Sequence, residues 1–397
     1  MRALRVLVPA ILTLAVFACG GEYPQSSVAP KTDFAESIHS LYGLVTLITL
    51  AILIVVWGVL AYIVVRFRAR PDAPDPRQRH GHLGMELAWT AIPTVIVIMI
   101  AIPTIQTVFA TQRELDEGAL VVDVIGHQFW WEFRYPNGVV TANELHLPVD
   151  VPVSLRMRSA DVIHSFWVPM LGGKRDVNPA VAAPPPSSRG GEAAPAEPGG
   201  RGAVAFNYLH FTIREPGVYR GQCAEFCGTS HSLMGVRVIA ESDAELRAWM
   251  ADWQGGVAGD TAAAADSALV VAADGAGGGG AARIELGRQT FHSSSCIACH
   301  AIQGTNAVGA IGPNLTLLGR RASLVGWLEN SPENLVRWIT APREIKPGAL
   351  MPGVAEVGGN FPPNNLSEEQ VRAVSEYLYS LGRQSSPGSG VAPGGAR

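Results

Sequence analysis

Two long apolar stretches without a charged residue constrain the fold of this chain more than any other feature. Residues 40–65 and 87–112 each hold about 26 residues, enough to cross a hydrocarbon core roughly 30 Å thick with some tilt. Two buried helices of a soluble domain are the alternative, but helices of that kind are usually shorter. The sequence therefore predicts a two-helix transmembrane hairpin over residues 40–112.

The charges around this hairpin predict its orientation. Five arginines follow the first stretch: Arg66, Arg68, Arg70, Arg77 and Arg79. Basic loops stay on the cytoplasmic side, so segment 19–39 and everything after residue 113 are expected on the periplasmic face of a bacterial inner membrane. Glu86, at the cytoplasmic end of the second stretch, has two interpretations. It is either a carboxylate that snorkels into the headgroups or a proton-uptake group.

The first residues read as a secretory signal. Arg2 and Arg5 precede an apolar run over 6–18 that is short for a bilayer, which predicts a signal peptide over residues 1–18. The run ends at Cys19, directly after a small residue, and this resembles a bacterial lipoprotein processing site with a lipidated Cys19. A plain signal peptide cut elsewhere is the alternative, because Phe17 does not suit such a site.

The exported part begins with a β-rich domain, expected over residues 113–253. Its predicted strands cover 121–125, 153–158, 218–220 and 236–239, where β-branched residues or apolar/polar alternation dominate. Gly and Pro punctuate them at short intervals, as in a β-sandwich or barrel. A flexible insertion is expected over 178–203, and a short amphipathic helix over 241–253 closes the domain.

A second folded unit is expected over residues 283–382. A Gly/Ala-rich linker over 254–282 precedes it, and a disordered tail over 383–397 follows it. Helical patterns return within this unit, with helix-start signals at Ser331 and Ser367. No internal repeat is visible.

Residues 223–234 carry the first metal-binding pattern. Within twelve residues they contain Cys223, Cys227, His231 and Met234. Thiolates and a thioether beside an imidazole favour copper, whereas Met is a poor zinc ligand. Two cysteines let a second metal share the thiolates. His164, at a predicted strand end, is the candidate for the second histidine ligand. A disulfide is the alternative, but it leaves His231 and Met234 unexplained.

This segment resembles subunit II of cytochrome c oxidase, whose dicopper CuA centre has the pattern Cys-x-Glu-x-Cys-x-x-x-His-x-x-Met. The resemblance covers about 200 residues and implies a cupredoxin-like β-barrel in which Cys223 and Cys227 bridge both coppers. It implies His164 and Met234 on one copper, and His231 with the backbone carbonyl of Glu225 on the other. The Glu225 side chain becomes a candidate for a magnesium ion at the boundary with subunit I.

Two further features bear on the resemblance. The family's Glu-x-x-Trp-Thr-x-x-Pro pattern is matched by Glu86, Trp89, Thr90 and Pro93, which favours Glu86 as the entrance to a proton pathway. Phe129, however, stands where the family usually has the Trp that receives electrons from a soluble cytochrome. This difference counts against a mobile cytochrome docking directly at the copper domain.

Residues 296–300, Cys-Ile-Ala-Cys-His, form a second pattern, the attachment signature of a c-type haem. Cys296 and Cys299 would form the thioethers and His300 the proximal bond. Met351 is the only Met after the motif and is the expected distal ligand, with His292 as a rival placed close to the attachment site. The segment 312–315 and the closing helix resemble small class I cytochromes c, which implies an all-α domain.

The resemblance implies a relay from a reduced donor through haem c and CuA to haem in subunit I. There oxygen would be reduced to water with proton translocation, so the oxygen-reducing site lies in another subunit. The implied partners are subunits I and III, a reduced c-type cytochrome or other periplasmic donor, and membrane lipids. The net charge of −4 gives no strong attraction to nucleic acid. A free-standing electron shuttle and a copper-handling protein are the two other interpretations.

Overall fold

The computed structural model describes residues 23–68, 81–112, 117–179, 206–259, 279–355 and 360–382. The predicted signal peptide 1–18 and Cys19 lie outside these residues, as do Arg70, Arg77 and Arg79. All but the first two residues of the predicted insertion 178–203, and the whole predicted tail 383–397, also lie outside them.

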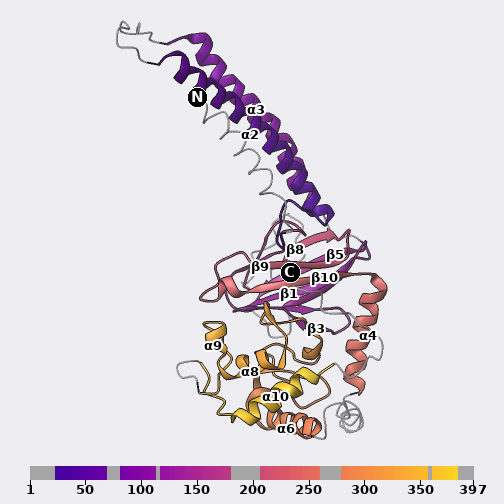
Figure 1. Ribbon diagram of the computed structural model, residues 1–397. Helices are drawn as coiled ribbons and strands as arrows, with labels where there is room; N and C mark the ends of the chain where they lie inside the picture. Colours follow the sequence, from indigo (N-terminus) through magenta and orange to yellow (C-terminus); the bar gives the residue numbers. More distant parts are fainter. Residues whose placement is uncertain are drawn as a thin grey trace, which may run out of the picture.

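Two helices, α2 (Asp33–Arg66) and α3 (Leu83–Ala110), lie side by side and project from the rest of the chain (Figure 1). α2 begins at Thr32, whose side chain accepts the backbone N–H of Ala35. The most apolar 18-residue window of each helix is 0% buried, so its apolar side chains face outward as they do in lipid. The predicted two-helix transmembrane hairpin is confirmed.

The start of α2 is attached to the β-domain, the name used below for residues 117–241. Thr32 donates its hydroxyl to the carbonyl of Leu171 at 2.7 Å. Asp33 accepts the backbone N–H of Thr212 at 2.8 Å. These contacts place the β-domain at the end of the hairpin where α2 begins and α3 ends (Figure 1).

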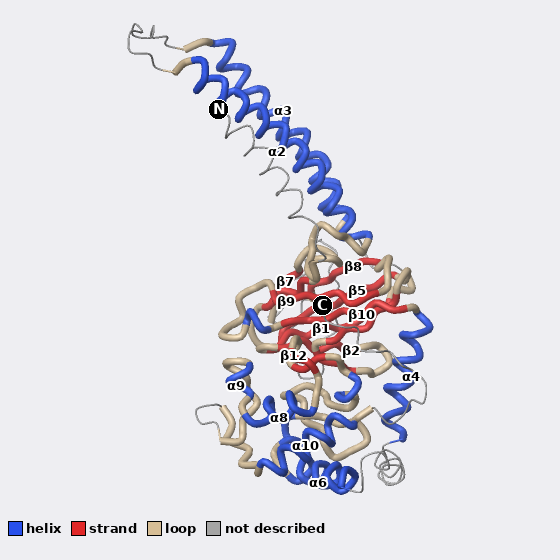
Figure 2. Tube along the Cα trace, in the orientation of Figure 1, coloured by secondary structure: helices blue, strands red, loops and turns tan. Residues whose placement is uncertain are grey.

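The β-domain consists of two five-stranded sheets (Figure 2). One sheet has the order β3-β2-β1-β5-β8 and the other β4-β10-β9-β6-β7. The strands are β1 (Leu120–His127), β2 (Trp130–Arg134), β3 (Val140–Ala142), β4 (Glu144–Pro148), β5 (Pro152–Ser159), β6 (His164–Trp167), β7 (Arg175–Val177), β8 (Asn207–Thr212), β9 (Gly217–Cys223) and β10 (Gly235–Glu241).

The inward faces of the two sheets form the core of the β-domain. Trp131, Leu155 and Phe166 belong to this core and are almost completely buried. The four predicted strands are confirmed as parts of β1, β5, β9 and β10. The other six strands are short or lack clear alternation, so periodicity alone did not reveal them.

The C-terminal domain, residues 279–382, is mainly helical. Its helices are α6 (Gly279–Ser293), α7 (Cys296–Cys299), α8 (Pro332–Thr340), α9 (Pro342–Ile345) and α10 (Glu368–Ser380). A two-stranded pair, β11 (Ser323–Leu324) and β12 (Leu328–Glu329), and a 3-10 turn η2 (Leu318–Arg320) complete it. The predicted caps are confirmed: Ser331 caps α8, and Ser367 forms a capping box with Gln370 at α10.

Helices α6 and α10 approach each other closely because α6 has a glycine at the contact. A Cβ on Gly287 would lie 2.0 Å from the carbonyl oxygen of Ala373 on α10. A larger residue at position 287 would therefore separate the two helices.

The predicted linker 254–282 is helical at both ends. α4 (Asp243–Gly259) extends beyond the predicted helix 241–253, and α6 already begins at Gly279. Residues 260–278 lie outside the described part. Ala favours helices, so a Gly/Ala-rich composition did not exclude helical ends. Trp253 of α4 is buried against the β-domain, and Trp249 stacks on His146 with ring centroids 4.0 Å apart.

Candidate metal centre and haem pocket

Strand pairing assembles the candidate copper ligands from two parts of the chain. β9 ends at Cys223, and Cys223 donates its backbone N–H to the carbonyl of Met234 at 2.9 Å, just before β10 begins. The segment between them, which includes the 3-10 turn η1 (His231–Leu233), is therefore the connection of a β-hairpin. β6 pairs with β9 through Phe166 and Cys223, which brings His164 beside the hairpin end.

The side-chain ligand atoms converge. The Sγ atoms of Cys223 and Cys227 are 3.9 Å apart, and both thiols are free. Cys223 Sγ lies 3.9 Å from His164 Nδ1, while Cys227 Sγ lies 3.8 Å from both His231 Nδ1 and Met234 Sδ. The two cysteine sulfurs lie at the centre of this cluster, and two imidazoles and a thioether surround them. This set of donors suits a pair of soft metal ions that share the thiolates.

Glu225 contributes two different groups near this cluster. Its backbone carbonyl lies 3.2 Å from Cys223 Sγ. Its carboxylate lies 3.5 Å from the ammonium of Lys174 and forms an exposed ion pair with it. Hence the carbonyl belongs to the cluster, whereas the carboxylate is available to a partner at the surface.

The surroundings of the two thiols shift their pKa values in opposite directions. The Cys227 thiol and the His164 ring hold the pKa of Cys223 far below its ordinary value, although burial opposes this. The neighbouring Cys223 thiolate and burial raise the pKa of Cys227. The thiolate form is therefore favoured at one of the two sulfurs, and a thiolate is the form that binds metal.

Asp161 orients the His164 ring. His164 Nε2 lies 2.8 Å from Asp161 Oδ1, which leaves Nδ1 toward the sulfurs. Burial alone would lower the pKa of His164, but Asp161 and Cys223 raise it above its ordinary value. A Cβ on Gly126 would lie 2.7 Å from His164 Cδ2, so glycine is needed there. Sequence reasoning did not identify Asp161; its position three residues before His164 was the available signal.

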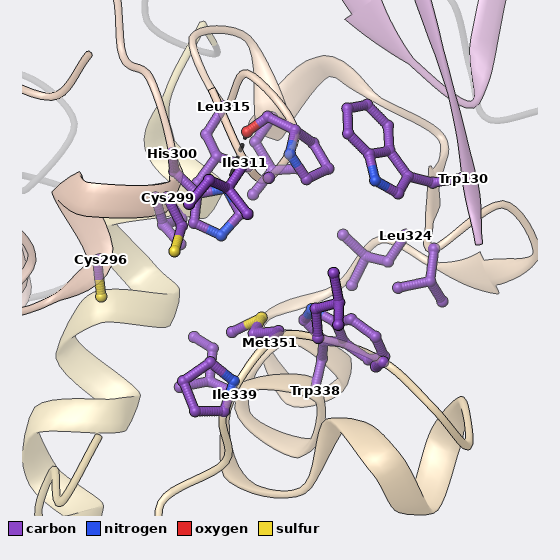
Figure 3. A pocket seen from close by; sticks show the side chains of 18 of the residues that line it. Trp130, Cys296, Cys299, His300, Ile311, Leu315, Leu324, Trp338, Ile339 and Met351 are labelled. Atoms are coloured by element: carbon purple, nitrogen blue, oxygen red, sulfur yellow. Dashed lines mark hydrogen bonds between the residues drawn. The ribbon is translucent and has the colours of Figure 1, made fainter. Parts of the chain in front are cut away.

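The candidate haem pocket is a cavity of about 300 Å³ lined mainly by the C-terminal domain (Figure 3). Cys296, Cys299, His300 and Met351 surround it together with apolar residues such as Leu315 and Ile339. An apolar cavity with two free thiols, an imidazole and a thioether at its wall fits a covalently attached haem with axial His and Met ligands.

His300 is oriented by the segment that follows it. Its Nδ1 lies 2.8 Å from the carbonyl of Pro313, as expected for a ring whose Nε2 serves as a ligand. Burial lowers the pKa of His300, which favours the neutral imidazole needed for ligation. A Cβ on Gly312 would lie 2.6 Å from His300 Cε1, so the segment 312–313 can approach the ring only with glycine.

The rival ligand His292 is engaged elsewhere. Its Nδ1 lies 2.6 Å from Asn306 Oδ1, and its Nε2 lies 3.3 Å from the hydroxyl of Tyr377. It is absent from the described residues that line the cavity. The geometry therefore favours Met351 over His292 as the group opposite His300.

The haem pocket has a wall from the β-domain, which sequence reasoning did not predict. Gln128, Phe129, Trp130 and Asn143 line the cavity together with the C-terminal residues. Trp130 stacks on His127, with ring centroids 4.2 Å apart. The pocket therefore reaches the aromatic run directly after β1, between the two domains.

Two basic side chains, the buried Lys346 and the half-buried Arg321, also line this cavity. Burial lowers the pKa of Lys346 to about 7 and that of Arg321 to about 10. Glu144 of the β-domain opposes the effect at Arg321. A haem carries two carboxylates, so cationic groups in an otherwise apolar wall are compatible with that group.

Glu86 occupies the first turn of α3. Its Oε1 accepts the backbone N–H of His82 at 3.0 Å, which satisfies a donor at the start of the helix. This contact is a structural role for the carboxylate, and proton uptake by Glu86 stays a prediction.

Comparison with known proteins matches three parts of the chain to family models. Residues 23–107 match the model for the transmembrane domain of cytochrome c oxidase subunit II, and 196–241 match its periplasmic domain. Residues 284–382 match the model for cytochrome c.

Full-length relatives match nearly the whole chain. The cytochrome c oxidase subunit 2 of Alkalihalophilus pseudofirmus is 33% identical over 386 residues, covering 96% of this chain and 97% of the relative. That of Bacillus subtilis is 29% identical over 398 residues, covering 96% and 98%. Among solved structures, the periplasmic domain of the Bradyrhizobium japonicum oxidase subunit II is 23% identical, with a TM-score of 0.27, and covers 34% of this chain and 94% of that chain.

Proposed function

The chain belongs to the cytochrome c oxidase subunit II family, and from this premise we propose that it is the subunit through which electrons enter a terminal oxidase. A reduced donor would deliver electrons to a covalent haem c in the C-terminal domain. They would pass to a dinuclear CuA centre in the β-domain and then to haem in subunit I, where oxygen is reduced to water with proton translocation.

One observation carries this proposal: the candidate haem pocket and the candidate copper centre are separated by a single aromatic segment. Phe129 and Trp130 line the haem pocket. Gln128, next to them, donates its side-chain amide to the carbonyl of Cys227 at 2.6 Å. Two sites with redox-active donor sets on either side of one segment suit transfer between them.

At the copper centre, Cys223 and Cys227 would bridge both ions. His164 and Met234 would complete one ion, and His231 with the Glu225 carbonyl the other. Two thiolate-bridged coppers supply a one-electron centre whose charge is shared over both metals. The protein's part is to hold the ligands rigidly: β6 carries His164, β9 carries Cys223, and the connection between β9 and β10 carries the others, while Asp161 fixes the His164 ring.

In the C-terminal domain, Cys296 and Cys299 would hold the haem covalently, and His300 and Met351 would bind its iron. A His/Met pair gives a haem suited to electron transfer at a raised potential. The chain's own contribution is to keep His300 neutral and to surround the group with apolar side chains.

The remaining assignments concern the assembly. We infer subunit I and subunit III as membrane partners, with both folded domains on the periplasmic face. The exposed carboxylate of Glu225 would contribute to a magnesium site at the subunit I boundary, and Glu86 would open a proton pathway into that subunit. A processed signal peptide and lipidated Cys19 would add an anchor at the N-terminus.

Optical and electron paramagnetic resonance spectra of the purified full chain with added copper test the proposal. Mixed-valence dicopper resonance together with a c-type haem spectrum is the expected result. A haem spectrum without the dicopper signal would refute the copper assignment. Release of copper to an acceptor protein without electron transfer would favour a copper-handling role instead.

A further inference from the structure

Phe129 lies between the ligand loops of the two sites. Its ring belongs to a side chain that is 6% exposed. A Cβ on Gly228, next to Cys227, would lie 3.1 Å from ring atoms Cε1 and Cζ. A Cβ on Gly348, three residues before Met351, would lie 3.1 Å from Cε2. The copper loop (residues 224–234) and the distal-ligand loop (residues 346–351) therefore pack against different edges of one aromatic ring, and each does so through a glycine.

Lys346 fastens the distal-ligand loop to the backbone of the same residue. Its Nζ donates to the carbonyl of Phe129 at 2.5 Å and to the carbonyl of Val325 at 3.1 Å. One acceptor belongs to the β-domain and the other to the C-terminal domain. One residue further on, Pro347 accepts the hydroxyl of Ser230 from the copper loop. The segment 346–348 thus contacts the β-domain through side chain and backbone.

The setting of Lys346 is unusual for a lysine. The residue is 4% exposed, and among the described residues no carboxylate lies within 4.0 Å of its Nζ. Lysine is rarely buried without an anionic partner. Val325, whose carbonyl it binds, has φ +49, a backbone region that β-branched residues seldom adopt.

We propose that Lys346 is a positioning residue that holds the distal-ligand loop of the haem pocket on Phe129, and that Phe129 is the packed bridge between the two centres. This inference rests on the proposed relay. Transfer between fixed centres slows steeply as the gap between them opens, so a bond that prevents opening keeps transfer fast. Lys346 keeps the bridge in contact with both loops.

The test uses the full chain carrying copper and haem, in wild-type form and as Lys346→Met, which keeps length but removes the donor. Hydrogen exchange is followed over residues 126–131 and 229–231, and haem-to-copper transfer is followed after photoreduction of the haem. Loss of this buried hydrogen bond is expected to speed exchange about tenfold or more and to slow transfer. Arg372→Met, which removes an exposed cation from α10, is the matched control and should match the wild type.

Gly348→Ala is a second, independent variant. Its added methyl group would push the distal-ligand loop away from the Phe129 ring. Faster hydrogen exchange and slower haem-to-copper transfer are therefore expected in this variant too, even if Lys346→Met loses its haem. Unchanged exchange and transfer in both variants would overturn the proposal. A lower unfolding midpoint with unchanged exchange at 126–131 would also overturn it, because Lys346 would then serve only the stability of its own domain.

The relay and the positioning role fail in different ways. If wild-type protein shows both spectra but no haem-to-copper transfer, the relay is wrong. Exchange at 126–131 then still decides whether Lys346 holds the loop on Phe129.

Discussion

At the scale of single residues, the candidate copper centre depends on groups that do not touch the metal. Asp161 is bonded to His164 Nε2, and its second oxygen accepts the backbone N–H of Gln128 at 2.6 Å. It therefore connects a ligand with the aromatic segment between the two sites. Burial would raise the pKa of Asp161, but these hydrogen bonds lower it overall and keep the carboxylate charged.

Asp161→Asn should weaken copper binding about 10- to 100-fold, because a partner of a metal-bound imidazole fixes its tautomer and orientation. Competition with a chelator of known affinity measures this in the full chain. Asp150→Asn, an exposed change on the β-domain surface, is the control and should bind copper like the wild type. Equal affinity of both variants would show that Asp161 does not orient His164.

Glu132 is a second residue whose surroundings predict a measurable effect, here a dependence of folding stability on pH. The side chain is buried on β2, and its Oε2 lies 3.0 Å from His127 Nε2, while its Oε1 accepts from Arg134. Burial would raise its pKa above the ordinary value of 4.5, but the bonds with His127 and Arg134 lower it overall.

The folded-state pKa of Glu132 is thus below the unfolded value, so its stabilising effect is present above pH 4.5 and is lost as pH falls below that value. Urea unfolding from pH 6 to about pH 3 should show a steeper loss of stability in the wild type than in Glu132→Gln. Glu368→Gln, at an exposed ion pair, should keep the wild-type slope. If stability fell equally steeply with pH in all three proteins, the carboxylate of Glu132 would not be a source of the pH dependence.

At the scale of elements, the haem domain depends on how closely α6 and α10 pack. Gly287→Ala adds a methyl group 2.0 Å from the Ala373 carbonyl, and the helices must separate. Overpacking of this kind costs about 1–3 kcal/mol, so denaturant unfolding followed by haem absorbance should shift to lower concentrations. Gln289→Ala, exposed on the same helix, should change stability by less than about 0.5 kcal/mol. If Gly287→Ala and Gln289→Ala shifted the unfolding midpoint equally, the α6–α10 contact would not limit the stability of the domain.

At the scale of the whole molecule, the β-domain and the C-terminal domain are joined by buried as well as exposed contacts. Glu144 of β4 is 5% exposed and accepts the backbone N–H and hydroxyl of Ser323, each at 2.9 Å. Asp252 and Arg320 form a more exposed cross-domain ion pair at 3.1 Å. The buried Glu144 contact should stabilise the association of the domains more than the exposed ion pair does, because hydrogen bonds to a buried carboxylate contribute more than a surface pair.

Glu144→Gln should therefore uncouple the two domains, whereas Asp252→Asn should not. Loss of a charged acceptor costs about 1.5–3 kcal/mol, against about 0–1 kcal/mol for the exposed pair. Thermal unfolding followed by copper-centre and haem absorbance is expected to give coincident transitions in the wild type and in Asp252→Asn. Separate transitions are expected in Glu144→Gln, and coincident ones there would show that Glu144 does not join the domains.

The sequence alone determined the features that reside in short segments. The two charge-free stretches predicted the hairpin because length and polarity decide whether a helix suits lipid. The Cys223–Met234 and Cys296–His300 patterns indicated their chemistry because ligands within one loop need only local spacing. The helix caps at Ser331 and Ser367 were visible for the same reason.

Only the tertiary structure decided how distant segments meet. Pairing of β6 with β9 places His164 beside Cys223, and Asp161 acquires its role only once the ring is there. Phe129 and Trp130 form a wall of a pocket whose other side comes from the C-terminal domain, and the bond from Lys346 to Phe129 joins residues 217 positions apart. Such contacts follow from how two domains pack, and neither spacing nor periodicity along the chain encodes that packing.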